Sequence, residues 1–254
     1  MNERIVLAYS GTPACSAAVA WLGEQHGADV VTVTVDVGQT DDLDAVRARA
    51  LACGAVRAHV IDARDIFARD HVIPALRADA DPPLATLAHP LIARTLVDIA
   101  VIEAATAVAH ASSGTALDAG VAAIDPTLRT IAPARAHMSL APAGPPREPH
   151  LLIRRSIDPA RAADDDVVLT ISFEQRIPVA VNGVSMALPE LIECLSLIGG
   201  LRGIGYGDAL PAPGAAILRA AYAAAGDSNS VRLRLHAGAC AILAAPTPEL
   251  VNHP

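Results

Sequence analysis

The sequence predicts an α/β fold, in which a doubly wound parallel sheet is followed by a smaller α+β domain. Short, almost continuous apolar runs at 4–10, 29–38 and 56–62 have the composition of strands that are buried on both faces. Segments of helical composition lie between these runs and end at Gly27 and Gly54, where a glycine favours helix termination. Strand and helix therefore alternate as βαβ units with right-handed crossovers.

The remainder of the first half continues this alternation. Helical composition predicts helices at 64–77 and 84–105, and the next apolar run predicts a strand at 106–111. The stretch SSGTALDAG at 112–120 is rich in small and turn-forming residues, which indicates a loop. A further strand is expected at 130–135.

A linker is predicted at 141–149, where APAGPPREP is too rich in Pro and Gly for a helix or a central strand. We therefore expect a nucleotide-binding-like domain at 1–140 and an α+β domain at 150–254. In the second domain VVLTISFE and IPVAV indicate strands, LPELIECLSLIGG and PGAAILRAAYAAAG indicate helices, and Asn182–Gly183 is a tight-turn signal. The last strands form a hairpin that turns at Ala237–Gly238.

Composition excludes several classes of protein. The 19 basic and 27 acidic side chains give a net charge of −8, and no block of basic residues could follow a nucleic-acid backbone. Charged residues interrupt every apolar run before it reaches the length of a membrane span. The first residues lack the pattern of a signal peptide, so we expect a cytoplasmic protein. The four cysteines lack metal-ligand spacing and are expected to be reduced thiols.

Ligands of open parallel sheets bind beyond the carboxyl ends of the strands, which directs attention to the loops there. The first loop, SGTPACS at 10–16, joins a strand to a helix N-terminus. Backbone N–H groups and the helix dipole at such a turn suit an anion such as pyrophosphate. Ser10 and Ser16 also fit a purely structural interpretation, as a turn residue and a helix cap. Both interpretations remain open from the residues alone.

Other polar residues near these loops allow two interpretations each. His89 precedes a proline and is either a structural group or a ligand-binding one, whereas His110 ends a strand at the predicted ligand edge. Asp118 either binds a ligand or caps a short helix. Cys15 at a helix N-terminus is either a nucleophile or, as we favour, a small apolar filler. Asp164–Asp166 is interpreted as a solvated turn.

Ordered motifs along nearly the whole chain resemble one family. They are IVLAYSG, TVDVGQ, RDHVIPALRA, HPLIAR, IAPAR, ISFEQRIPVAVNG, LIECLSLIGGLRGIG and PGAAIL. In these motifs the sequence resembles the argininosuccinate synthase family of arginine biosynthesis. The resemblance implies an N-type ATP pyrophosphatase (PP-loop) fold with ATP and Mg as cofactor. It also implies a ligase reaction in which ATP adenylates citrulline, pyrophosphate leaves, and the amine of aspartate displaces AMP.

The resemblance also implies two sets of site residues, while no catalytic residue is assigned. The expected nucleotide-binding residues follow the first, second and fourth strands and are Tyr9, Ser10, Gly11, Thr12, Ser16, Thr34, Val35, Asp36 and Ala111. The expected substrate-binding residues are Ser113, Gly114, Asp118 and His89.

The chain departs from the family pattern at polar positions. The family's first loop reads SGGxDTS, and Thr12 and Ala14 here replace its second glycine and its aspartate. In the second loop Thr115, Leu117 and Val121 replace a lysine, an asparagine and an arginine. Each lost charge-assisted hydrogen bond to a carboxylate substrate costs about 1.5–3 kcal/mol.

Two hypotheses follow from these departures. The chain is either an ATP-dependent, AMP-forming C–N ligase with weakened or redirected activity toward a small amino-acid-like substrate, or a non-catalytic paralogue that serves as a ligand-binding or partner module. The family's C-terminal oligomerisation arm is not found in the sequence, so a monomer or homodimer is expected.

Overall fold

Two compact units make up the chain. The computed structural model describes residues 3–39, 42–78, 84–112, 114–133, 156–162, 164–206, 213–226 and 228–244. The described residues up to Ala63 and from Leu84 to Pro133 form the first unit. Arg64–Ala78 and the described residues from Ser156 onward form the second. A segment from the middle of the first unit's sequence, Arg64–Ala78, therefore belongs to the second unit. The sequence did not indicate this arrangement.

The first unit contains the predicted parallel sheet. Its five strands are β1 (Arg4–Ala8), β2 (Asp29–Asp36), β3 (Arg57–Asp62), β4 (Ala107–His110) and β5 (Arg129–Ile131). They are hydrogen-bonded in the order β3-β2-β1-β4-β5, and every neighbouring pair is parallel. Because the order reverses at β1, the carboxyl ends of β1 and β4 flank the switch point at which such sheets bind ligands.

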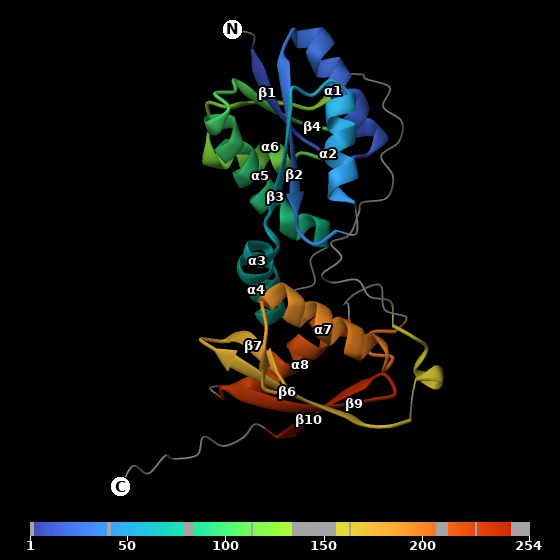
Figure 1. Cartoon of the computed structure of the whole chain (residues 1–254). Coiled ribbons are helices and arrows are strands. Elements are labelled where there is room, and N and C mark those ends of the chain that lie inside the picture. Colours follow the sequence, from blue (N-terminus) through green and yellow to red (C-terminus); the bar gives the residue numbers. More distant parts are fainter. Residues whose placement is uncertain are drawn as a thin grey trace. The chain divides into compact units, whose positions relative to one another are not determined.

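Helices cover both faces of this sheet, as Figure 1 shows. They are α1 (Pro13–His26), α2 (Leu43–Ala52), α5 (Leu84–Ile102) and α6 (Ala116–Ile124). Successive side chains of β1 point to opposite faces. Ile5 and Leu7 join the core that contains residues of α1 and α2, whereas Val6 joins the core that contains residues of α5 and α6. The predicted doubly wound α/β fold is confirmed.

The loop expected at 112–120 is shorter than predicted, because α6 already begins at Ala116. Gly120 suggested a loop but lies inside the helix. A Cβ on Gly120 would lie only 2.8 Å from the Cβ of Ala93 on α5, so this glycine allows the two helices to approach closely. The strand expected at 130–135 also ends early, at Ile131.

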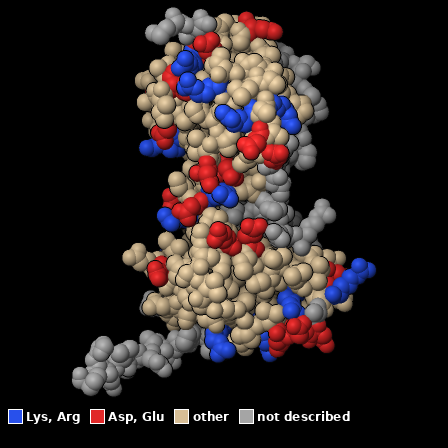
Figure 2. All heavy atoms as spheres, in the orientation of Figure 1, with Lys and Arg blue, Asp and Glu red and all other residues tan. Residues whose placement is uncertain are grey.

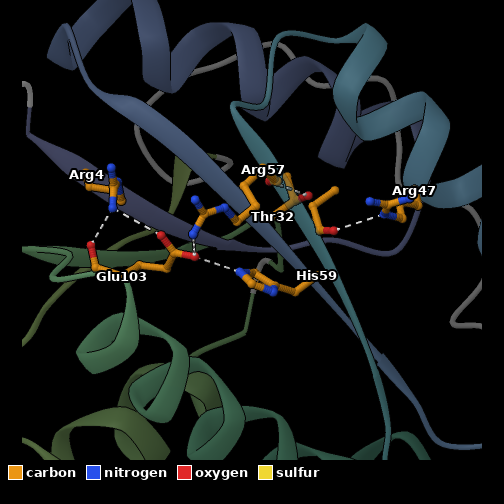
Figure 3. A network of polar contacts seen from close by, with 7 residues as sticks. Arg4, Thr32, Arg47, Arg57, His59 and Glu103 are labelled. Atoms are coloured by element: carbon orange, nitrogen blue, oxygen red, sulfur yellow. Dashed lines mark hydrogen bonds and ion pairs between the residues drawn. The ribbon is translucent and has the colours of Figure 1, made fainter.

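A buried carboxylate, that of Glu103, forms hydrogen bonds with residues near the amino ends of two strands. Glu103 follows α5, and its side chain is only 1% exposed. Its oxygens accept hydrogen bonds from Arg4 at 3.1 Å and from Arg57 at 2.6 Å, and they lie 2.8 Å from Nε2 of His59 (Figure 3). One side chain therefore connects the end of α5 to β1 and β3.

The second unit is built on an antiparallel sheet in the order β10-β9-β6-β7-β8. Its strands are β6 (Val167–Glu174), β7 (Ile177–Val181), β8 (Val184–Ser185), β9 (Ser230–His236) and β10 (Ala239–Ala244). The predicted hairpin turns at Asn182–Gly183 and Ala237–Gly238 are confirmed, since all four residues have the positive φ that tight two-residue turns require.

Two helices, α7 (Leu188–Gly200) and α8 (Pro213–Ala225), pack on each other and on strands of this sheet. At Gly214 the helices are so close that a Cβ would lie 2.6 Å from the carbonyl oxygen of Ile192. The segment expected as one helix at 64–77 consists of α3 (Arg64–Phe67), the π-helical turn η1 (Ala68–Val72) and α4 (Ile73–Arg77), and it packs against α7 and α8. The linker expected at 141–149 lies outside the described residues, so the domain boundaries stay a prediction.

The surface carries charges of both signs. Figure 2 shows acidic and basic side chains interspersed on one face, without a continuous basic area. Asp165 forms an ion pair with Arg202, and Asp166 lies 3.1 Å from Nδ1 of His236, so two side chains contact the exposed acidic turn at 164–166. None of the helices in the described part of the chain is long and apolar enough to cross a membrane.

Candidate functional site

The carboxyl ends of β1, β2 and β4 lie side by side in the first unit. Ala8, the last residue of β1, pairs with Val33 on one side and with His110 on the other. The loops after β1 and β4 therefore begin at neighbouring positions, whereas β2 continues for three more residues to Asp36 before its loop begins. These loops carry the residues that the family resemblance assigned to a nucleotide.

Hydrogen bonds inside the first loop shape the turn from β1 into α1. Thr12 is the N-cap of α1, and its Oγ1 accepts a hydrogen bond from the N–H of Cys15 at 3.3 Å. Ser10 Oγ donates to the same Thr12 oxygen at 3.3 Å. Ser16 lies inside the helix, 2.9 Å from the Tyr9 hydroxyl, so the interpretation of Ser16 as the cap is wrong.

Gly11 is required at the tip of this loop. Its φ of +71° is unfavourable for other residues, and a Cβ there would lie 3.0 Å from Cγ2 of Val46 on α2. Behind the loop, Nη1 of Arg49 donates a hydrogen bond to the carbonyl oxygen of Gly11 at 2.7 Å. Sequence reasoning missed Arg49, because an arginine on an exposed helix face has the pattern of an ordinary surface residue.

Tyr9 connects the first loop to β2. Thr34 Oγ1 donates to the carbonyl oxygen of Tyr9 at 2.9 Å, and the Tyr9 side chain is buried in the core beneath the loop. Burial raises the pKa of the Tyr9 hydroxyl, and the hydrogen bond with Ser16 opposes this effect only in part. Tyr9 therefore acts as a neutral, hydrogen-bonded support for the loop.

The loop after β2 is closed by its own side chains. Asp36 Oδ1 accepts a hydrogen bond from the N–H of Gly38 at 2.8 Å. Gln39 accepts from the N–H of Val37 at 2.9 Å and donates to the carbonyl oxygen of Val35 at 3.0 Å. These local hydrogen bonds hold the backbone of the turn that follows Thr34–Asp36 in one conformation.

The loop after β4 brings together a histidine and a carboxylate. His110 is buried, and its Nε2 lies 3.3 Å from Oδ1 of Asp118 in the first turn of α6. Asp118 is therefore not the cap of that helix, whose N-cap residue is Thr115. Ser112 Oγ accepts from the N–H of Gly114 at 3.2 Å. Ala111 continues from β4, whereas Ser113 lies outside the described residues.

His89 lies in the first half of α5, next to Pro90. The end of α5 leads to the amino end of β4, so the first turns of the helix lie toward the carboxyl edge. The Nδ1 atom of His89 is buried, and no hydrogen bond joins it to another of the described side chains or backbone groups. The role of His89 as a ligand-binding residue therefore stays a prediction.

The positions at which the chain departs from the family pattern are mostly internal. Ala14 in the first turn of α1 is buried. On α6, Leu117 is 6% exposed and Val121 is 0% exposed, and both join the core between the sheet and α5. Thr115 is exposed. Apolar packing therefore occupies positions at which the family carries an amide and a guanidinium group.

The arrangement is suited to an anion. The positive end of the 14-residue helix α1 lies at the glycine-containing turn, and backbone N–H groups there can donate to phosphate oxygens. Across the described ranges no cluster of three or more His, Cys, Asp or Glu side chains is placed to hold a metal ion. The fold and this edge define the protein as an open α/β domain of the doubly wound class, in which ligands bind beyond the carboxyl ends of the strands at the switch in strand order.

Comparisons with known proteins identify the family. Residues 4–142 match the family model described as "Arginosuccinate synthase N-terminal HUP domain". The argininosuccinate synthase of Oceanobacillus iheyensis is 35% identical over an alignment that covers 80% of this chain and 60% of that protein. The argininosuccinate synthase of Dehalococcoides mccartyi is 36% identical over 81% of this chain and 62% of its own length. That of Pyrobaculum aerophilum is also 36% identical, over 80% of this chain and 63% of its own length.

The chain belongs to the argininosuccinate synthase family, which confirms the resemblance found in its motifs. It spans about 60% of the length of the curated relatives it matches.

Proposed function

We propose that this chain binds ATP at the β1–α1 loop and is an argininosuccinate synthase-like ligase whose ATP-dependent, AMP-forming reaction is weakened or redirected to another amino-acid-like acceptor. The proposal rests on a difference between two segments at the same edge of the sheet, the β1–α1 loop and helix α6. The turn around Gly11 leads into the N-terminus of α1, which supports the binding of an anion there, whereas Leu117 and Val121 of α6 are packed in the core.

The nucleotide half of the proposal rests on the first two loops. The backbone of Ser10, Gly11 and Thr12, with the N-terminus of α1, would hold the phosphates, and Thr34–Asp36 would line the adenosine side. ATP would supply the adenylyl group that activates the acceptor oxygen; the bond between the α- and β-phosphates breaks, pyrophosphate leaves, and the attacking amine later displaces AMP. Mg is proposed to arrive with the triphosphate. Because Thr12 adds a side chain and Pro13 lacks an N–H group, we expect weak affinity, about 10⁻⁴ to 10⁻³ M.

The acceptor half of the proposal rests on α6 and the loop before it. Citrulline and aspartate both carry carboxylates, which need charged or amide partners. Thr115, Leu117 and Val121 offer none of the groups found in the family. Losing such contacts at about 1.5–3 kcal/mol each lowers the rate with citrulline and aspartate by at least about three powers of ten.

The same apolar replacement on α6 favours a second candidate function, a non-catalytic module that binds a nucleotide or a partner. The two candidates differ in whether bound ATP reacts. A ligase of altered specificity exchanges pyrophosphate with ATP in the presence of its acceptor, and a binding module does not.

Two measurements test the proposal. Titration calorimetry with Mg-ATP should give a dissociation constant of about 10⁻⁴ to 10⁻³ M. The absence of heat at several millimolar ATP, or saturation at low micromolar ATP, contradicts the nucleotide half. A coupled pyrophosphate assay with mass detection of argininosuccinate should show no product from ATP, citrulline and aspartate. Turnover of about one per second or faster contradicts the acceptor half.

A further inference from the structure

The helix α2 contacts the tip of the β1–α1 loop through two side chains. Val46 packs where a Cβ of residue 11 would be, and Arg49 donates from Nη1 to the Gly11 carbonyl oxygen at 2.7 Å. Arg49 is exposed on the surface of the helix. An exposed arginine loses side-chain entropy when it is held in one place, so a short hydrogen bond to a loop carbonyl indicates a specific contact.

This contact fixes the orientation of one peptide group. A trans peptide is planar, and its C=O and N–H groups point in opposite directions. Because the Gly11 carbonyl points toward Arg49, the N–H of Thr12 in the same peptide points away from α2. Gly11 adopts φ +71°. Because glycine has no Cβ, its backbone can adopt other conformations about as readily, and a contact to its carbonyl oxygen favours this one orientation.

We infer that Arg49 is a positioning residue for the phosphate-binding loop: its guanidinium holds the Gly11–Thr12 peptide in the orientation that presents an N–H donor to the nucleotide's phosphates. The inference rests on the proposed nucleotide binding at this loop. The guanidinium also places a permanent positive charge beside the loop, which favours an anionic ligand. Arg49 acts through the loop backbone and not through a side-chain contact with the reacting atoms.

The same helix supplies a matched control. Arg47 is also exposed, and its Nε donates to a backbone carbonyl, that of Ala58 on β3, at 3.3 Å (Figure 3). Arg47→Ala and Arg49→Ala remove the same charge from neighbouring positions of α2. Only the second substitution removes the contact with Gly11.

The first test measures the loop without any ligand. Hydrogen exchange of the peptide covering residues 9–18 should be several-fold faster in Arg49→Ala than in the unmodified protein, and unchanged in Arg47→Ala. An Arg49→Lys variant keeps the charge but loses the forked geometry of the guanidinium, and its exchange should lie between the two. Equal exchange in all four proteins overturns the inference, whether or not ATP binds.

The second test measures affinity. Calorimetric titration with Mg-ATP should show about tenfold weaker binding for Arg49→Ala and at most a twofold change for Arg47→Ala. Equal affinity of Arg49→Ala and the unmodified protein overturns the inference and leaves the proposed nucleotide binding intact. Equal weakening in both variants also overturns it, because general charge then explains the effect. No binding by the unmodified protein overturns the proposed function and, with it, the role of Arg49 toward ATP.

Discussion

Nη1 of Arg57 lies 2.6 Å from Oε1 of Glu103, which joins the first residue of β3 to the segment between α5 and β4 across 46 positions of the chain (Figure 3). The Glu103 side chain is 1% exposed, whereas that of Arg57 is 59% exposed. The carboxylate therefore depends on its partners for the interactions it has lost with water, and the guanidinium depends on them much less.

Glu103→Ala should lower the free energy of unfolding by about 1.5–3 kcal/mol, because the charge-assisted hydrogen bonds from Arg4 and Arg57 are lost, while these partly exposed cations can turn to water instead. The measurement is urea denaturation at pH 7. Asp98→Asn is the control, because Asp98 pairs with Arg94 on the exposed face of α5 and its loss should change stability by less than about 0.5 kcal/mol. Similar small losses in both variants would show that the network around Glu103 is not formed.

Glu103 should also make stability depend on pH. Burial by itself would raise the pKa of Glu103, but hydrogen bonds from His59 and Arg57 and the charge of Arg57 outweigh burial, so the pKa lies below its ordinary value. A lowered folded-state pKa means that the stabilisation is complete above the unfolded pKa of about 4.3 and is lost as the pH falls through the folded value. The difference in unfolding free energy between the unmodified protein and Glu103→Gln should therefore be constant above about pH 5 and shrink below pH 4. A difference that grows on acidification contradicts the assignment.

Gly11→Ala should destabilise the first unit for two reasons, the φ of +71° and the crowding of the new Cβ against Val46 at 3.0 Å. Gly27→Ala is a matched control, because Gly27 has φ +59° and no neighbouring atom within 4 Å of an added Cβ. We expect about 1 kcal/mol of destabilisation for Gly27→Ala and about 2 kcal/mol for Gly11→Ala in thermal unfolding. Equal losses would mean that α2 does not pack against the loop.

The sequence was sufficient for the parallel sheet because the central strands β1, β2 and β4 are largely buried and the first two helices stop next to Gly27 and Gly54. It also located the three loops of the candidate site, since the carboxyl ends of parallel strands share one edge. The sequence was misleading where contacts between distant segments, and not the local residue pattern, determine the structure. Gly120 suggested a loop, but its place in α6 is determined by contact with Ala93, and nothing in 64–77 indicates that this segment packs with the second unit. Arg49 belongs to the same class, because its role depends on the position of Gly11.

The acceptor side of the site cannot be restored by returning the family's residues one at a time. Val121→Arg places a guanidinium at a position that is 0% exposed and packed between α5 and the sheet, so we expect a loss of at least about 3 kcal/mol of unfolding free energy. Thr115→Lys returns the family's lysine at an exposed position and should change stability by less than about 0.5 kcal/mol.

Neither substitution should yield argininosuccinate from ATP, citrulline and aspartate, because each replaces only one of several missing contacts. Urea denaturation and the coupled pyrophosphate assay measure the two outcomes. If Val121→Arg unfolds at the same urea concentration as the unmodified protein, the side chain of residue 121 faces solvent or the ligand edge and not the core. The interpretation of α6 as an apolar replacement of the acceptor site then fails. If Thr115→Lys alone produces argininosuccinate, a single cation was the missing element and the chain is closer to a working citrulline enzyme than its buried α6 residues indicate.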